Sequence, residues 1–370
     1  MRYIYKKIVE DIQNKMVFIG GPRQVGKTTL GEFLLENIKS GVYLNYDDLD
    51  DKSLILKREW KDSDKLIFID ELHKYPEWKN FIKGTYDKQK KLHQFLLTGS
   101  ARMDLYRKGG DSLMGRYHYW RLYPYGIAEV IPGIEGKAKL EKLIKFGGFP
   151  EPFWKGSETF YKQWRKDRYL KIIYEDVRDL TYIKEIQKMS ILLNLLKTRV
   201  GGEVVYSNLA KDLQVASQTV KNWIEIYEKL YVVFSIYPYS NDLTRAITHI
   251  PKVYFYDNGE VPKEKFKNLI AIELLKKLHY LEDSEGDEYE LCYIRDREKR
   301  EVDFLIVKNN VPQELIEVKN SQENISASLH YFSKKLNILK KTQIVLNLEK
   351  SFVKDGVSVI NPIEYFSSYE

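Results

Sequence analysis

Residues 21–28 read Gly21-Pro22-Arg23-Gln24-Val25-Gly26-Lys27-Thr28, an octet that fits the P-loop pattern G-x-x-x-x-G-K-[ST] at every fixed position. The apolar run 16–19 before it predicts a strand, and the helical spacing of apolar residues in 30–38 predicts a helix after it. A glycine-rich turn between a strand and a helix points backbone N–H groups and the positive helix end at a phosphate. The octet therefore predicts a nucleoside triphosphate site.

The P-loop pattern also assigns roles to single side chains. Lys27 is expected to reach the β- and γ-phosphates, and the Thr28 hydroxyl is expected to coordinate Mg²⁺. The nucleotide-binding residues predicted in this way are Gly21, Pro22, Arg23, Gln24, Val25, Gly26, Lys27, Thr28 and Thr29.

Two further apolar runs end in polar residues. Residues 66–69 lead into Asp70-Glu71, as a buried parallel strand delivers carboxylates to a sheet edge. Asp70 is expected to hold Mg²⁺, and Glu71 to orient and polarise the attacking water. Residues 94–97 lead into Thr98-Gly99-Ser100, where either Thr98 or Ser100 can contact the γ-phosphate or the water. These residues complete a predicted site for nucleotide hydrolysis.

Three arginines follow within twenty residues of this third run, at positions 102, 107 and 116. Phosphoryl transfer develops charge on the γ-phosphate oxygens, and an arginine from a neighbouring subunit can stabilise that charge. We select Arg116, in Ser112-Leu113-Met114-Gly115-Arg116, as the arginine that acts in this way. A ring or dimer of this chain is the corresponding expectation.

Several of these motifs together resemble a known family, the prokaryotic AAA+ ATPases that carry a C-terminal module of unknown function. The resemblance rests on residues 21–29, Tyr43-Leu44-Asn45-Tyr46-Asp47-Asp48, Ile69-Asp70-Glu71-Leu72-His73, Leu97-Thr98-Gly99-Ser100, Gly115-Arg116, Phe146-Gly147-Gly148-Phe149-Pro150-Glu151 and Pro251-Lys252-Val253-Tyr254-Phe255-Tyr256-Asp257. The chain departs from the family after Asp257, where Asn258-Gly259-Glu260 replaces a Gly-Leu turn. The resemblance implies ATP as the nucleotide and a helical lid after the ATPase domain.

Composition narrows the class of protein. The chain has 370 residues, which suits two or three domains, and its only cysteine excludes an intramolecular disulfide. We find neither an apolar stretch of about 18 residues nor a signal peptide, so a cytoplasmic protein without a membrane partner is expected. A net charge of +7 permits a polyanionic partner such as DNA but does not require one.

The middle of the chain resembles a winged helix. A helix over 191–198 leads to a short helix, 208–213, capped by Ser207, and then to a second helix, 218–230, which Ser217 could cap. The apolar segment 231–237 reads as a hairpin-like wing. The exposed DNA-contacting positions of the second helix are expected to be Ser217, Gln218, Lys221 and Asn222. A winged helix that only packs against protein is the alternative.

The last hundred residues carry a second candidate site. A helix from Pro262 to His279 has Glu273 on its apolar face, and a strand over 301–307 returns after Lys308-Asn309-Asn310 as residues 313–319. Asp303, Glu317 and Lys319 can share one face of that hairpin, which resembles the PD-(D/E)xK nuclease core of archaeal Holliday-junction resolvases. Asp303, Glu317 and Glu273 would bind Mg²⁺, and Lys319 would position water. A catalytically dead remnant is the alternative.

The sequence thus predicts an α/β protein with a P-loop AAA+ domain, a helical lid, a winged helix and a nuclease-like α/β domain. The expected boundaries are 1–125, 126–190, 191–261 and 262–370. The leading hypothesis is an ATPase that remodels or translocates DNA, with branched DNA as one candidate substrate and with ATP and Mg²⁺ as cofactors. The rival is an ATP-dependent signalling or scaffold switch whose C-terminal module is inactive.

Overall fold

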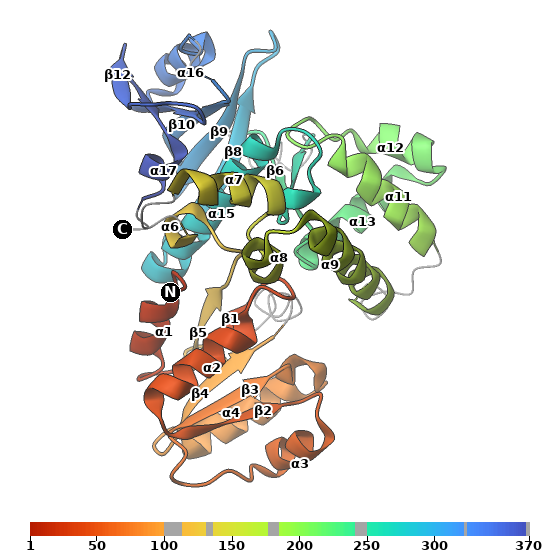
Figure 1. Cartoon of the computed structure of the whole chain (residues 1–370), viewed down its shortest axis with the longest axis vertical. Coiled ribbons are helices and arrows are strands. Elements are labelled where there is room, and N and C mark those ends of the chain that lie inside the picture. The colour runs from red at the N-terminus through yellow and green to blue at the C-terminus, as the bar shows by residue number, and fades with distance from the viewer. Residues whose placement is uncertain (100–112, 131–135, 177–184, 241–249, 322–323, 368–370) are drawn as a thin grey trace. The chain divides into compact units, whose positions relative to one another are not determined.

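The computed structural model describes residues 1–99, 113–130, 136–176, 185–240, 250–321 and 324–367 (Figure 1). They form two compact units. The first comprises Met1–Pro124 with Lys229–Tyr231, and the second comprises Tyr125–Glu228 with Val232–Glu370.

A five-stranded parallel sheet forms the centre of the first unit, in the order β2-β3-β4-β1-β5. Its strands are β1 (Met16–Gly20), β2 (Gly41–Asn45), β3 (Leu66–Asp70), β4 (Gln94–Thr98) and β5 (Tyr117–Arg121). Its helices are α1 (Tyr5–Asp11), α2 (Lys27–Ile38), α3 (Leu49–Lys57), the 3₁₀ turn η1 (Leu72–Lys74) and α4 (Trp78–Gln89).

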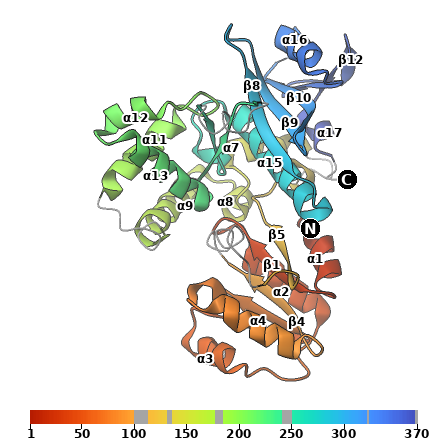
Figure 2. The same ribbon diagram turned by 180° about the vertical axis from the view of Figure 1, so that it is seen from behind.

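The central strands β1 and β3 are buried along their whole length, which explains why each reads as an unbroken apolar run. Alternate residues of each strand face opposite sides of the sheet. Ile67 and Ile69 pack in the cluster that holds Ile82 of α4, whereas Phe68 lies against α2 at Gly31. The sheet is therefore covered by α2 on one face and α4 on the other (Figures 1 and 2).

Helices occupy the first half of the second unit. They are α6 (Ile127–Val130), α7 (Gly136–Phe146), α8 (Pro150–Lys155), α9 (Glu158–Lys171), the π-helical turn η2 (Ile172–Asp176), α11 (Ile186–Lys197), α12 (Tyr206–Leu213) and α13 (Ser217–Lys229). A two-stranded sheet of β6 (Val233–Ile236) and β7 (Lys252–Phe255) follows, and then the 3₁₀ turn η3 (Asn258–Glu260).

Some expected element boundaries in this region are wrong. Helix α12 begins at Tyr206, and its N-cap Val205 makes no side-chain hydrogen bond, so Ser207 is not a cap. Ser217 is the first residue of α13 rather than its cap. The expected hairpin over 231–237 supplies a single strand, β6, because its antiparallel partner β7 comes later in the chain.

The second half of this unit is a six-stranded sheet in the order β12-β13-β11-β10-β9-β8. Its elements are α15 (Lys265–Glu285), β8 (Tyr289–Arg295), β9 (Glu301–Lys308), β10 (Val311–Lys319), α16 (Ala327–Leu336), β11 (Lys340–Val345), β12 (Phe352–Lys354), β13 (Val357–Ile360) and α17 (Pro362–Tyr365). Strands β8, β9 and β10 form an antiparallel meander, and β11 runs parallel to β10 after the crossover through α16.

The β9–β10 turn matches its sequence. Lys308 pairs with Val311, and the two intervening residues, Asn309 and Asn310, have φ of 48° and 63°. Two-residue hairpins favour this left-handed backbone, which asparagine tolerates better than most residues. The turn fixes the register of β9 and β10 and so places Asp303 near Glu317.

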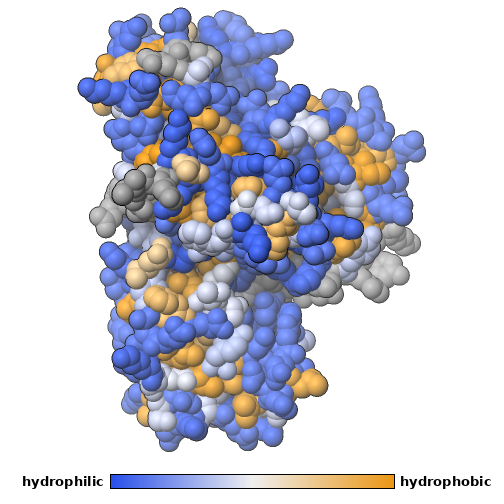
Figure 3. Space-filling model, viewed as in Figure 1, coloured by the Kyte–Doolittle hydropathy of each residue, from blue (hydrophilic) through white to orange (hydrophobic). Residues whose placement is uncertain are grey.

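Polar side chains cover most of the surface shown in Figure 3, and hydrophobic ones are scattered among them. Among the described residues, no helix has both the length and the apolar character needed to cross a membrane. Cys292 of β8 is buried, and burial followed by the nearby negative charge of Glu290 raises the pKa of its thiol.

Candidate functional site

The P-loop joins β1 to α2, and three of its residues have a left-handed backbone. Gly21, Gln24 and Gly26 have φ of 145°, 63° and 91°. A Cβ at Gly21 would lie 2.2 Å from the Leu122 carbonyl oxygen, so glycine is required there. Gly26 is the N-cap of α2 and provides no side-chain cap, which leaves the first N–H groups of the helix available to a phosphate.

Lys27 folds back onto the loop in this structure. Its Nζ donates to the carbonyl oxygens of Gly21 at 3.0 Å and Pro22 at 2.9 Å, and the side chain is buried. An ammonium held by two neutral carbonyls can move to a phosphate, because a charged acceptor forms the stronger hydrogen bond. This lysine is therefore placed for the expected contact.

Asp70 is the centre of the polar group at the carboxyl ends of β3 and β4. Its Oδ2 accepts a hydrogen bond from Thr28 Oγ1 at 2.6 Å, and its Oδ1 accepts one from Thr98 Oγ1. Oδ1 also accepts from the backbone N–H of Glu71 at 3.0 Å. Mg²⁺ prefers hard oxygen ligands such as carboxylate and hydroxyl oxygens. The side chains of Thr28 and Asp70 supply such oxygens side by side, so they fit a magnesium ion.

Glu71 follows Asp70 with a left-handed backbone, φ 58°. Its Oε2 lies 3.5 Å from His73 Nε2 and 3.9 Å from Lys74 Nζ, but it has no hydrogen-bond partner among the described residues. Burial raises the pKa of this carboxyl, and the charge of Asp70 raises it further, against the opposing charge of Lys27. A buried carboxylate with a raised pKa is suited to accept a proton from water.

Tyr43 is a residue of this group that the sequence reasoning missed. It lies on β2 opposite Phe68 of β3, and the two ring centroids are 5.0 Å apart. Burial raises the pKa of Tyr43 to about 12, and the charge of Asp70 and a hydrogen bond to it contribute. The available signal was the position of Tyr43 on a predicted strand, beside the strand that ends in Asp70.

The remaining predicted residues either pair with another residue or lie outside the described residues. Arg116 precedes β5, and its Nε and Nη2 donate to Asp87 at 2.9 and 3.1 Å. Arg102, Arg107 and Ser100 lie outside the described residues.

A second polar group lies in the six-stranded sheet. Asp303 of β9 and Glu317 of β10 are adjacent, since Asp303 N donates to Glu317 Oε2 at 3.4 Å. Lys319 Nζ lies 3.2 Å from Glu317 Oε1, so the three expected residues come together. A fourth residue, Lys267 of α15, was missed, and its Nζ lies 2.8 Å from Asp303 Oδ1. Burial is the main cause that raises the pKa of Glu317 to about 7, and the charge of Asp303 is the second.

Glu273 does not join this group, which corrects the expected metal site. It is fully buried on α15, and its Oε1 accepts from the backbone N–H of Ile127 at 3.0 Å. Gly126 lies against the Glu273 carboxylate, and Lys276, one helical turn later, pairs with Glu129. Among the described residues, no group of three or more His, Cys, Asp and Glu side chains could hold a metal ion.

The predicted DNA-contacting residues begin α13. Ser217, Gln218 and Asn222 are exposed and Lys221 is partly exposed, while Val220 and Trp223 are buried. Gln218 Nε2 donates to Asn222 Oδ1 at 2.8 Å. The four side chains thus lie on the solvent side of an amphipathic helix.

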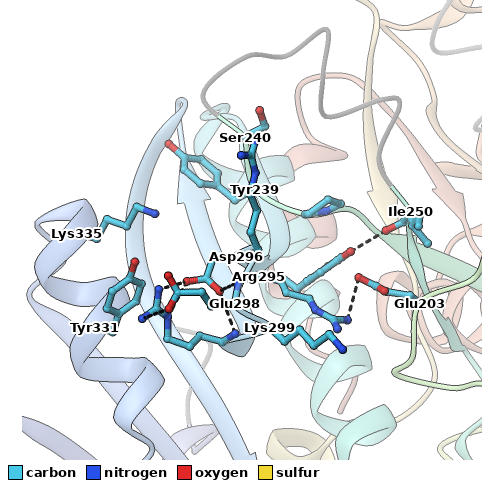
Figure 4. Close-up of a pocket in the computed structure, with 14 residues that line it drawn as sticks. Glu203, Tyr239, Ser240, Ile250, Arg295, Asp296, Glu298, Lys299, Tyr331 and Lys335 are labelled. Atoms are coloured by element: carbon cyan, nitrogen blue, oxygen red, sulfur yellow. Dashed lines mark hydrogen bonds and ion pairs between the residues drawn. The ribbon is translucent and has the colours of Figure 1, made fainter.

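A cleft with a volume of 720 Å³ lies near the β8–β9 turn (Figure 4). Its cations include Arg295, paired with Glu203 at 3.0 Å, and Arg300, paired with Asp296 at 2.7 Å. Three more line it, and for their side chains no ion pair or hydrogen bond is found within the described residues: Arg297, Lys299 and Lys335. Figure 4 also shows the rings of Tyr239 and Tyr331 in this cleft. The cleft thus combines aromatic rings with cations that lack an ion pair within the described residues, and Arg300 and Lys335 lie over the Tyr331 ring at 3.7 and 5.7 Å from its centroid.

The parallel sheet, the P-loop and the acids that follow β3 define the first unit as a P-loop domain. Three family models match consecutive parts of the chain. Residues 13–131 match an AAA domain, residues 137–262 match a domain of unknown function (DUF8612), and residues 264–366 match another domain of unknown function (DUF4143). The expected AAA domain is thus confirmed, whereas the matches to the rest of the chain name no fold or activity.

Curated relatives include an uncharacterized protein of Methanocaldococcus jannaschii, 26% identical over 376 residues, which spans 91% of this chain and 82% of the relative. An uncharacterized protein of Mycobacterium tuberculosis is 25% identical over 249 residues. The aligned part covers 66% of this chain and 54% of that relative.

Among solved structures, the Walker-type ATPase of Pyrococcus abyssi gives a TM-score of 0.45 at 14% identity, over 70% of this chain and 93% of that one. The ORC1 protein of Aeropyrum pernix, solved in complex with DNA, gives 0.34 at 10% identity, over 73% and 92%. Scores at this level carry no argument about activity.

Proposed function

We propose that this protein binds ATP with Mg²⁺ at the P-loop, hydrolyses the nucleotide, and uses the turnover to move or remodel DNA. The observation that carries the ATPase part is the arrangement around Asp70, where Thr28, Thr98 and Glu71 converge beside an uncapped helix end. The match of residues 13–131 to an AAA domain supports the same proposal.

In this proposal Lys27 leaves the carbonyls of Gly21 and Pro22 and binds the β- and γ-phosphates. Thr28 and Asp70 would hold Mg²⁺, which supplies positive charge to the phosphate oxygens when it is bound. Glu71 orients the attacking water and takes its proton, and its raised pKa brings it closer to neutral pH. Thr98 holds the second oxygen of Asp70 and so fixes the direction of that carboxylate.

Two features of the second unit support DNA as the partner. The cleft offers Arg297, Lys299 and Lys335 to phosphates, and the Tyr239 ring to an unstacked base. The start of α13, after α11 and α12 and before β6, presents polar side chains as a winged helix does. We therefore assign single-stranded DNA to the cleft and phosphate or base contacts to α13.

The six-stranded sheet supports a nuclease-like module. Helix α15, the β8-β9-β10 meander, the α16 crossover and the parallel β11 place Asp303, Glu317 and Lys319 on two neighbouring strands. The rival function, an ATP-dependent switch with an inactive module, draws support from one observation. Lys267 pairs with Asp303, which gives the carboxylate pair a cation from the chain itself.

ATP hydrolysis measured with and without DNA tests the proposal, with single strands, duplex and four-way junctions compared at low salt. We expect at least one DNA to stimulate turnover, and we expect the stimulation to weaken steeply as salt rises. A variant with Arg297→Glu and Lys299→Glu should lose stimulation by single strands. A matched variant with Lys350→Glu and Lys354→Glu, exposed lysines outside the cleft, should keep it. Slow hydrolysis that no DNA changes would favour the switch.

A further inference from the structure

The pair formed by Asp303 and Glu317 has hydrogen-bond or ion-pair partners for all four of its carboxylate oxygens. Asp303 Oδ1 faces Lys267 Nζ at 2.8 Å, and Oδ2 accepts from Val318 N at 3.0 Å. Glu317 Oε1 faces Lys319 Nζ at 3.2 Å, and Oε2 accepts from Asp303 N at 3.4 Å. The oxygens have the chemistry that a divalent cation prefers, but each already has a donor from the protein.

When both carboxyl groups are ionised, the charges of the group also balance without a metal ion. Two carboxylates face two ammonium groups, and both carboxylates are buried. A divalent cation added to this arrangement would bring uncompensated positive charge into a poorly solvated place, which is costly. Loss of one ammonium would instead leave net negative charge that attracts such an ion.

Lys267 is the ammonium placed to control this balance. It projects from α15 to Asp303, whereas Lys319 is two residues from Glu317 on the same strand. Lys267 also lines a pocket of 280 Å³ together with Lys263, Lys265 and Asn320, and a quarter of its side chain (24%) is exposed. Its side chain can therefore swing away from Asp303 without unfolding the helix.

We propose that Lys267 is a tethered cation that competes with divalent metal ions for the Asp303–Glu317 pair. The inference rests on the nuclease-like module of the proposed function and adds a control that the motif alone does not include. With Lys267 in place the pair is closed to Mg²⁺ or Mn²⁺, and with Lys267 displaced or neutralised it becomes a divalent-cation site.

The test is Mn²⁺ binding to the full chain, without nucleotide or DNA. Binding is monitored as the loss of the electron paramagnetic resonance signal of free Mn²⁺. We expect Lys267→Met to bind at least one Mn²⁺ tenfold or more tightly than the wild type. Lys267→Arg, which keeps the charge, and Lys263→Met, which removes an exposed lysine from the same pocket, should bind as the wild type does. Background binding at the P-loop is common to all four proteins.

Two further measurements test the same site, and the first of them applies to a Lys267→Met protein that is folded but destabilised. Mn²⁺ should raise the melting temperature of Lys267→Met more than that of the wild type, because the ion replaces the missing ammonium. Adding Asp303→Asn to Lys267→Met should abolish the gained Mn²⁺ site. Equal Mn²⁺ affinity in wild type and Lys267→Met, or a gained site that survives Asp303→Asn, would overturn the proposal. Neither readout depends on ATP hydrolysis, so failure here leaves the proposed ATPase untouched.

Discussion

Each carboxylate oxygen of Asp70 accepts a hydrogen bond from a hydroxyl group, Oδ2 from Thr28 and Oδ1 from Thr98. This arrangement leaves Glu71 as the neighbouring carboxylate whose Oε2 lacks a hydrogen-bond partner within the described part of the chain. The two adjacent acids are thus chemically distinct, since hydroxyl groups fix the carboxylate of Asp70 and the Glu71 carboxyl has a raised pKa, which suits the proton-accepting role that we propose for it.

Glu71→Gln tests that distinction. We expect nucleotide affinity to stay near the wild-type value, because Lys27 and the loop are unchanged. We expect hydrolysis to fall by about 100-fold or more, because an amide cannot take a proton from water. Binding of a fluorescent ATP analogue and steady-state phosphate release measure the two effects separately. Wild-type turnover in this variant would refute the assigned role.

Asp257 gives a pH-dependent prediction for stability. Burial, and then the charge of Glu260, raise the pKa of Asp257 to about 7, against the opposing effects of Arg168 and the Tyr161 hydroxyl. The unfolded chain releases this proton near pH 4. Between about pH 4 and pH 7 the folded state therefore binds the extra proton, and the contribution of Asp257 to stability is lost as the pH rises through that window.

Asp257→Asn should flatten the fall of melting temperature between about pH 5 and pH 7. Asp355→Asn, a change at an exposed turn residue, serves as the matched control and should keep the wild-type slope. Calorimetry at several pH values measures both. An Asp257→Asn protein with an unchanged slope would show that another group sets the pH dependence.

The two acidic sites differ in how far sequence could predict them. Asp70 and Glu71 follow an apolar run, which predicts a buried strand with acids at its carboxyl end. In the sheet only β4 separates this strand, β3, from the P-loop strand β1. Their place near the P-loop was therefore predictable. Glu273 was assigned to the wrong cluster because its place on the apolar stripe says nothing about which turn of α15 faces β9. Six residues of helix span about 9 Å, so Lys267 rather than Glu273 reaches Asp303.

Among the elements, α2 depends on a glycine for its close approach to the sheet. A Cβ at Gly31 would lie 2.4 Å from the Phe68 ring, and that ring is fully buried. We expect Gly31→Ala to lower the free energy of unfolding by about 1–3 kcal/mol, because neither the ring nor the helix can move freely.

Gly84 of α4 is the matched control, since a Cβ there meets nothing within 4 Å. Gly84→Ala should stabilise the protein by about 0.5–1 kcal/mol through helix propensity alone. Denaturant titration of both variants gives the comparison. A stabilising Gly31→Ala would show that α2 is not closely packed on β3.

The elements themselves were predicted better than their ends. Apolar runs indicated β1, β3 and β4, and an Asn-Asn pair indicated the β9–β10 turn, because these signals are local. Helix α15 begins three residues after the expected Pro262 and continues past His279 until Gly286, whose left-handed backbone ends it. The partner of β6 depends on pairing across a long connection, which a local pattern does not specify.

At the scale of the whole molecule, the sequence predicts a ring or dimer in which Arg116 of one copy acts on the nucleotide of its neighbour. Arg116 pairs with Asp87 of its own chain, and we propose that its catalytic role is in a neighbouring copy. Mixing Arg116→Ala subunits with Lys27→Ala subunits should restore part of the hydrolysis that each variant lacks alone. The test is phosphate release at several mixing ratios. Absence of any rescue would count against a role in trans.

The single cysteine has a practical consequence for experiments on the whole chain. Cys292 is buried and the pKa of its thiol is raised, so it should react slowly with maleimide at neutral pH. A reporter cysteine at an exposed position, such as Ser217→Cys, would then be the fast-labelling site in the native protein. The chain is thus already suited to site-specific fluorescent labelling without prior removal of its own thiol.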